Sequence, residues 1–159
     1  DRPRTLTVLV SETDSFKVSI AEYLSRTLTG SALTVTVRAL PWSDYLAALQ
    51  GGNFDLYLGE VRLTADWNLS ALIASGGALN YGGYADEQCD ALLSAFLANE
   101  TAQTASALCR CLGQSAPIAP IAFKTASVLT PEGLIDGLTP TVSSPFYRLS
   151  DWTVTFDKG

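Results

Sequence analysis

Strand and helix patterns alternate over the first 59 residues, and this order constrains the fold more than any other feature of the chain. Apolar and polar residues alternate at positions 5–10 and again at 33–39, as in half-buried strands. Between them, apolar residues recur at helical spacing after Asp14 or Ser15 as the N-cap and before Gly30. A helix that joins two strands in this way is typical of a parallel pair.

A second crossover of the same kind comes directly after it. Pro41 ends the second strand, Ser43 is the predicted N-cap of a short helix, and Gly51 and Gly52 end that helix. An apolar run at residues 54–59 then predicts a third strand. Three strands linked by two helices predict an α/β fold with a doubly wound sheet and right-handed crossovers.

The second half of the chain reads as helical and then loop-rich. The pattern predicts a helical turn at 69–74 and two helices at 87–98 and 102–112, which form an antiparallel hairpin packed on the sheet. Pro117 and Pro120 introduce an expected edge strand at 121–129. A short strand is expected at 153–156.

Composition restricts the class of protein. The chain has 159 residues, of which 47% are hydrophobic and only 16% charged, so we expect one compact domain. The net charge of -6 disfavours binding to nucleic acid. No apolar run reaches the roughly 20 residues of a transmembrane helix. The first four residues are not a signal peptide and the chain has no Met, so we expect a processed or excised chain.

Several kinds of catalytic chemistry are disfavoured. The chain has no His, which excludes Ser-His-Asp and Cys-His mechanisms within it. Its glycine pairs match neither of the two common nucleotide-binding motifs. Asp55 in the third strand is read as a structural position rather than a catalytic one. An enzyme that uses pairs of Asp or Glu is the last-ranked alternative, and we expect no enzyme and no cofactor.

The candidate ligand site begins where the third strand ends. Gly59 and Glu60 are followed within one loop by Arg62, Asp66 and Trp67. A guanidinium binds a carboxylate through two hydrogen bonds, a carboxylate accepts from an ammonium, and an indole covers apolar groups or a cation. This set suits a zwitterion such as an amino acid or peptide. In the alternative, Glu60 pairs with Arg62, and Trp67 fills the core.

A second loop adds polar and aromatic side chains. Asn80 and Tyr81 lie in the glycine-rich segment before the first helix of the hairpin. Such groups on a loop are typical of small-molecule contacts, and equally of a turn packed with tyrosines.

The three cysteines allow a bridge across the helical hairpin. Counted from the turn near Asn99, Cys89 is level with Cys109 or Cys111. We prefer Cys89 with Cys109, because Cys109 follows the inward-facing Leu108. Three buried free cysteines are an equal alternative. A Cys-x-Cys pair without His is a poor zinc motif, so no metal is expected.

The order of these features over roughly the first 130 residues resembles the extracellular family 5 solute-binding proteins of ABC importers, which include oligopeptide and dipeptide receptors. The matching pieces are Leu40-Pro41-Trp42-Ser43-Asp44-Tyr45, the strand at 53–59, Gly76-Gly77, Asn80-Tyr81-Gly82-Gly83-Tyr84, the helix at 89–93 and the strand at 116–121.

The resemblance implies a type II periplasmic-binding-protein-like lobe. The family binds its ligand between two α/β lobes, and residues 1–159 resemble most of the C-terminal one, without the N-terminal lobe and its signal or lipoprotein segment. In the family, the loop after the Phe-Asp strand carries an Asp that pairs with the ammonium of the peptide. Asp66 is the candidate here, although Glu60 stands where family members usually have Trp.

The implied function is that of a noncatalytic transport component. We expect a monomeric, extracytoplasmic protein, in the periplasm or anchored as a lipoprotein, that binds a peptide or related small solute and presents it to the permease of an ABC transporter. The alternative is the ligand-sensing domain of a transcription regulator with the same lobe fold.

Overall fold

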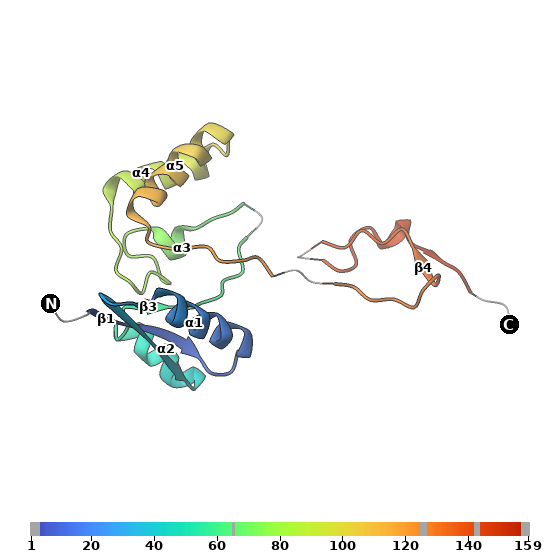
Figure 1. The fold of residues 1–159 in the computed structure, drawn as a ribbon. Coiled ribbons are helices and arrows are strands. Elements are labelled where there is room, and N and C mark those ends of the chain that lie inside the picture. The colour runs from blue at the N-terminus through green and yellow to red at the C-terminus, as the bar shows by residue number, and fades with distance from the viewer. Residues whose placement is uncertain (1–3, 65, 125–126, 142–143, 157–159) are drawn as a thin grey trace. The chain divides into compact units, whose positions relative to one another are not determined.

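The computed structural model describes residues 4–64, 66–124, 127–141 and 144–156 (Figure 1). By its internal contacts the chain divides into two compact units, Asp1–Ala119 and Pro120–Gly159. That the whole chain acts as a single lobe stays a prediction.

The first unit contains a three-stranded parallel sheet. Its strands β1 (Arg4–Ser11), β2 (Leu33–Leu40) and β3 (Leu56–Tyr57) lie in the order β2-β1-β3. The connecting helices are α1 (Ser15–Leu28) and α2 (Trp42–Gln50). The predicted α/β class with parallel strands is therefore confirmed.

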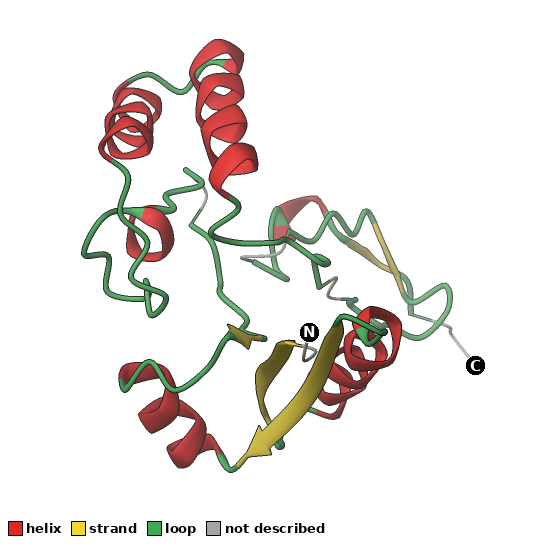
Figure 2. Cartoon of the chain, turned by 60° about the vertical axis from the view of Figure 1, so that its left-hand side comes forward, coloured by secondary structure: helices red, strands yellow, loops and turns green. Residues whose placement is uncertain are grey.

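The two crossover helices lie on either side of the sheet (Figure 2), and successive side chains of its central strand β1 pack against different ones. Val8 and Val10 belong to one cluster, which includes Ala21 of α1. Leu9 belongs to another, which includes Tyr45 and further residues of α2. Because alternate side chains of a strand point to opposite faces, the two crossover helices cover opposite faces of the sheet.

Two local predictions near the sheet need correction. The helix α2 begins at Trp42, with Pro41 at its N-cap position, because the N–H of Tyr45 donates to the Pro41 carbonyl at 2.9 Å. Ser43 therefore lies inside the helix and is not its cap. The third strand is also shorter than predicted, since Asp55 accepts a hydrogen bond from the backbone N–H of Thr7 at 2.7 Å just before β3 begins. This contact gives Asp55 a structural role.

The helices in the rest of the first unit have their own core. It contains α3 (Ser70–Ile73), α4 (Glu87–Ala98) and α5 (Ala102–Ser115). Ile73, Leu93 and Leu108 form a buried cluster in which α4 and α5 pack on α3. The predicted hairpin is thus confirmed, but its predicted packing on the sheet is wrong, because α3 covers its apolar face.

In its described residues, the second unit is mostly loop. Its strands β4 (Ile135–Asp136) and β5 (Thr153–Val154) pair antiparallel, and η1 (Leu149–Asp151) is a single 3-10 turn. The predicted strand at 153–156 is confirmed in its first two residues. The strand predicted at 121–129 is absent from the described part of that range, 121–124 and 127–129, where no other strand pairs with the chain.

None of the helices in the described ranges is both long enough and apolar enough to cross a membrane.

Replacement of Leu9 tests the importance of the central strand. Leu9 is 0% exposed, so Leu9→Ala should lower the free energy of unfolding by about 2–5 kcal/mol through lost burial and a residual cavity. Urea titrations followed by circular dichroism measure this change. Leu129→Ala is the control, because Leu129 is 91% exposed and its truncation should cost less than about 0.5 kcal/mol. Equal losses in the two variants would contradict this account of the core.

Candidate functional site

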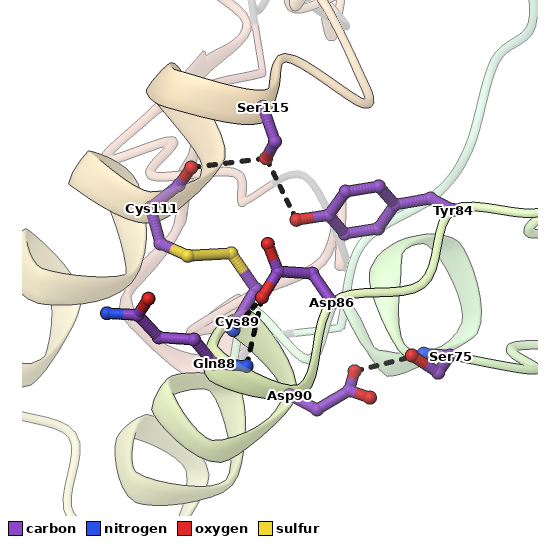
Figure 3. Close-up of a disulfide and its surroundings, with 8 residues drawn as sticks. All are labelled: Ser75, Tyr84, Asp86, Gln88, Cys89, Asp90, Cys111 and Ser115. Atoms are coloured by element: carbon purple, nitrogen blue, oxygen red, sulfur yellow. Dashed lines mark hydrogen bonds between the residues drawn. A yellow bond between two sulfur atoms is a disulfide. The ribbon is translucent and has the colours of Figure 1, made fainter.

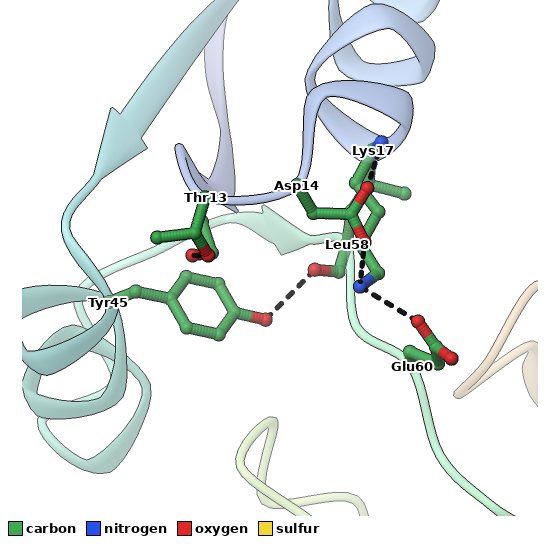
Figure 4. Close-up of polar contacts among 7 residues, drawn as sticks. Thr13, Asp14, Lys17, Tyr45, Leu58 and Glu60 are labelled. Atoms are coloured by element: carbon green, nitrogen blue, oxygen red, sulfur yellow. Dashed lines mark hydrogen bonds and ion pairs between the residues drawn. The ribbon is translucent and has the colours of Figure 1, made fainter.

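The carboxyl ends of β1 and β3 meet at one edge of the sheet, as parallel neighbours must, and one lysine connects the segments that leave these two strands. Lys17, in the first turn of α1, places its Nζ 2.7 Å from an oxygen of Asp14 and 3.0 Å from an oxygen of Glu60 (Figure 4). Asp14 is the N-cap of α1, and Glu60 lies in the loop after β3, which ends at Tyr57. The ion pairs therefore connect the start of the candidate ligand loop to α1.

The pKa of Lys17 reflects this arrangement. Burial lowers it, but the hydrogen bonds and charges of Asp14 and Glu60 outweigh burial and raise the pKa above 10.5. The lysine is therefore a cation at neutral pH, and it holds two carboxylates at once. An exposed ion pair contributes little, but the Lys17 side chain is only 19% exposed.

Tyrosines line the same edge. The Tyr45 hydroxyl of α2 donates to the Leu58 carbonyl at 2.9 Å (Figure 4). Burial, with the nearby Tyr57 and Tyr81, raises the pKa of Tyr45 to about 12. The ring of Tyr57 makes an edge contact with that of Tyr81, with centroids 6.2 Å apart. A Cβ on Gly59 would lie only 3.1 Å from the Tyr57 ring, so the glycine allows this close packing.

Beyond Glu60 the predicted ligand residues are exposed. This holds for Arg62, Asp66 and Trp67. Hydrogen bonds from the Thr64 side chain and the Asn68 N–H lower the pKa of Asp66, so it is an anion at neutral pH. Trp67 is 53% exposed, which contradicts the alternative that it fills the core. Its φ of 52° is in the left-handed region that side chains disfavour.

The glycine-rich loop contributes one residue that packs on the edge and one that shapes the loop. Tyr81 packs against the cluster of Leu9, Tyr45 and Tyr57. Asn80 donates from Nδ2 to the carbonyls of Ala74 and Tyr84, at 3.0 and 2.6 Å, and its Oδ1 accepts from the Tyr84 N–H at 2.9 Å. The structure thus brings Gly59 and Tyr81 to the same tyrosine, whereas the Asn80 amide holds the loop together. Ligand contact by Gly59, Asn80 or Tyr81 stays a prediction.

Lys17, Tyr45 and Tyr57 were not predicted from the sequence as residues of this site. A signal for Lys17 was available, because it is one of three lysines and lies three residues after the helix N-cap. The sequence contains no comparable signal for the two tyrosines. An apolar pattern does not distinguish a tyrosine that only fills the core from one whose hydroxyl also bonds to the backbone at the end of a strand.

The disulfide differs from the preferred prediction. Cys89 is bonded to Cys111, with Cα atoms 5.9 Å apart (Figure 3). Cys109 is a free, exposed thiol. The pairing of Cys89 with Cys109 is therefore wrong. Residues three apart share a helix face, whereas adjacent residues are turned by about 100°. The buried Leu108 thus places Cys111, not Cys109, on the inward face.

Asp86 lies beside this bond. Its carboxylate and the two bonded sulfurs are within 4.8 Å of one another. The sulfurs are not metal ligands in this form, because cysteine binds metals as a free thiolate.

Comparison with known proteins identifies the fold. No protein-family model matches the sequence, and no curated protein matches it. Among solved structures, the murein tripeptide binding protein MppA of Escherichia coli is 24% identical, with a TM-score of 0.57 over 76% of this chain and 25% of that one. The oligopeptide-binding protein AppA of Bacillus subtilis, in complex with a nonapeptide, is 13% identical, with a TM-score of 0.63 over 96% and 32%.

A third similar structure contains a metal chelate. NikZ of Campylobacter jejuni, in complex with Ni(L-His), is 14% identical, with a TM-score of 0.62 over 94% of this chain and 33% of that one. The chain therefore spans about a quarter to a third of the length of these proteins. Its fold is that of a part of the family 5 solute-binding proteins of ABC transporters, which are binding proteins and not enzymes.

Replacement of Tyr45 tests the support of the strand end. Tyr45→Phe removes the hydrogen bond to Leu58 and should cost about 1 kcal/mol at neutral pH. A folded-state pKa of about 12 against an ordinary 10 means that only the unfolded chain loses this proton as the pH rises past 10. Stability of the wild type should therefore fall between pH 10 and 12, and the variant should lack this component. Urea titrations across this range measure it.

The exposed Tyr23, replaced as Tyr23→Phe, is the control for this experiment. A Tyr45→Phe variant with the full alkaline loss would show that another group causes it.

The cysteines provide a matched pair of variants. Cys111→Ser should lower the free energy of unfolding by about 2–4 kcal/mol, because the bridge spans 22 residues. Cys109→Ser should change it by less than about 0.5 kcal/mol. Urea titrations with and without reductant measure both, and reductant should destabilise the Cys109→Ser variant but not the Cys111→Ser variant. The reverse order of the two variants would restore the pairing of Cys89 with Cys109.

Proposed function

We propose that this chain is one lobe of the solute-binding component of an ABC importer, and that it closes with a second lobe on a peptide or related small zwitterionic solute. The observation that carries the proposal is the fold match, in which 96% of this chain aligns with 32% of an oligopeptide-binding protein. Such a protein presents its solute to a membrane permease, and each lobe contributes part of the contacts.

The chemistry of the sheet edge supports a zwitterionic ligand. Asp66 is an exposed anion that suits an ammonium, and Arg62 suits a carboxylate. Trp67 adds an exposed indole directly after Asp66 in the sequence. Lys17 and Tyr45 hold the start of the loop that carries Arg62, Asp66 and Trp67.

The composition of the chain and the charged groups of this loop favour peptides over metal chelates. Imidazole is the commonest neutral metal ligand in proteins, and the chain has no His. The exposed groups of the loop instead complement the two charged ends of a peptide. Because NikZ contains Ni(L-His), the chelate is the most useful competing ligand in a test.

The disulfide supports an extracytoplasmic location. Bonds such as Cys89–Cys111 form and persist in oxidising compartments. A periplasmic or lipoprotein-anchored monomer fits the proposed role.

The binding test uses the full-length gene product that contains this chain, with trialanine, N-acetyl-trialanine and Ni(L-His)2 as probes in titration calorimetry. Trialanine should bind, and acetylation should weaken binding at least about tenfold, because it removes the ammonium that pairs with Asp66. Asp66→Asn should weaken trialanine binding to a similar extent and should no longer distinguish the two peptides.

Glu22→Gln is the control for charge, since it removes one exposed carboxylate from α1. Binding of the nickel chelate without binding of either peptide would overturn the ligand class. A helix-turn-helix domain beside this chain in the gene product would favour the regulator instead.

A further inference from the structure

The glycine-rich loop between Gly76 and Gly83 is anchored to the disulfide-bonded hairpin at both ends. On one side, the backbone N–H of Ser75 donates to the Asp90 carboxylate of α4 at 2.9 Å. On the other, the Tyr84 hydroxyl lies 2.8 Å from Ser115 Oγ at the end of α5 (Figure 3). We propose that the hairpin closed by Cys89–Cys111 positions this loop for ligand binding, with Tyr84 and Asp90 as positioning residues.

The disulfide connects the two anchors through a short ring of contacts. Cys89 is in the first turn of α4, five residues after Tyr84, and Cys111 is four residues before Ser115. The Cys89–Cys111 bond and the Tyr84–Ser115 hydrogen bond therefore close the same ring. Within it, the Asp86 carboxylate accepts from the N–H groups of Gln88 and Cys89 and fixes the start of α4.

The proton of the Ser115 hydroxyl decides which residue donates in the hydrogen bond between Tyr84 and Ser115. A serine hydroxyl has a single proton to donate. Ser115 donates its proton to the Cys111 carbonyl at 3.2 Å. The Tyr84 hydroxyl must therefore be the donor to Ser115 Oγ, so that Tyr84→Phe removes the anchor without disturbing the end of α5.

The loop needs anchors because its ends are glycines. Gly76 and Gly83 have φ values of 78° and 66°, in a region that glycine enters easily. Asn80 bonds the loop to itself through the backbone of Tyr84. Any displacement of Tyr84 is therefore passed to Asn80 and to the neighbouring Tyr81, which packs on Tyr57 at the sheet edge.

The ligand part of this inference rests on the proposed function, but the positioning part has its own measurement. In the full-length gene product without ligand, Tyr84→Phe should raise amide hydrogen exchange at residues 76–83 about fivefold, the loss expected for one hydrogen bond. Exchange in β1 should not change. Ser115→Ala should have the same effect, the double variant should add little, and Ser115→Thr should restore the wild-type rate because it retains a hydroxyl. Tyr23→Phe on α1 is the matched control.

Affinity for trialanine provides the second measurement. Tyr84→Phe should weaken binding about fivefold, and reduction of the disulfide in a Cys109→Ser background should weaken it at least as much. Unchanged exchange at 76–83 in Tyr84→Phe overturns the positioning role. Faster exchange with unchanged affinity overturns the role of the loop in binding. Failure of the wild type to bind trialanine counts against the proposed ligand class, while the exchange result still decides the positioning role.

Discussion

The parallel ladder between β1 and β2, buried on both faces of β1, is the constraint on which the first unit depends. All eight residues of β1 pair with β2, and Val8, Leu9 and Val10 are almost fully buried. A parallel pair requires a crossover, and burial on two faces requires a helix on each. The positions of α1 and α2, and of the loops at the carboxyl edge, result from this one requirement.

The candidate site lies at the carboxyl edge of the sheet, where side chains of the two covering helices hold the loop after β3. Lys17 joins α1 to Glu60, and Tyr45 joins α2 to Leu58. Both helices that cover the sheet thus also hold the loop after β3. The hairpin holds the second loop in the same way, through Asp90 with Ser75 and Ser115 with Tyr84. Support of loops by rigid elements is what preorganised recognition requires.

Local patterns predicted the elements well. The bounds of α4 were predicted to the residue because Asp86 is an N-cap and Asn99 follows the last apolar turn. The predictions failed where a partner distant in sequence decided the outcome. The strand expected at 121–129 had apolar residues but no neighbouring strand in the described part of the sheet. Cys109, next to the buried Leu108, was expected on the inward face of α5, but Cys111, three residues after Leu108, lies there, so the predicted pairing was wrong.

The sequence by itself determined the α/β class, the parallel order of crossovers and the charged and aromatic residues of the loop after β3, because periodicity and capping act between residues close in the chain. Only the tertiary structure decided that Lys17 binds Glu60, that Asn80 shapes its loop and that Cys89 pairs with Cys111. These contacts join residues on different elements or opposite sides of a turn, and their geometry depends on how faces pack, which no local pattern contains.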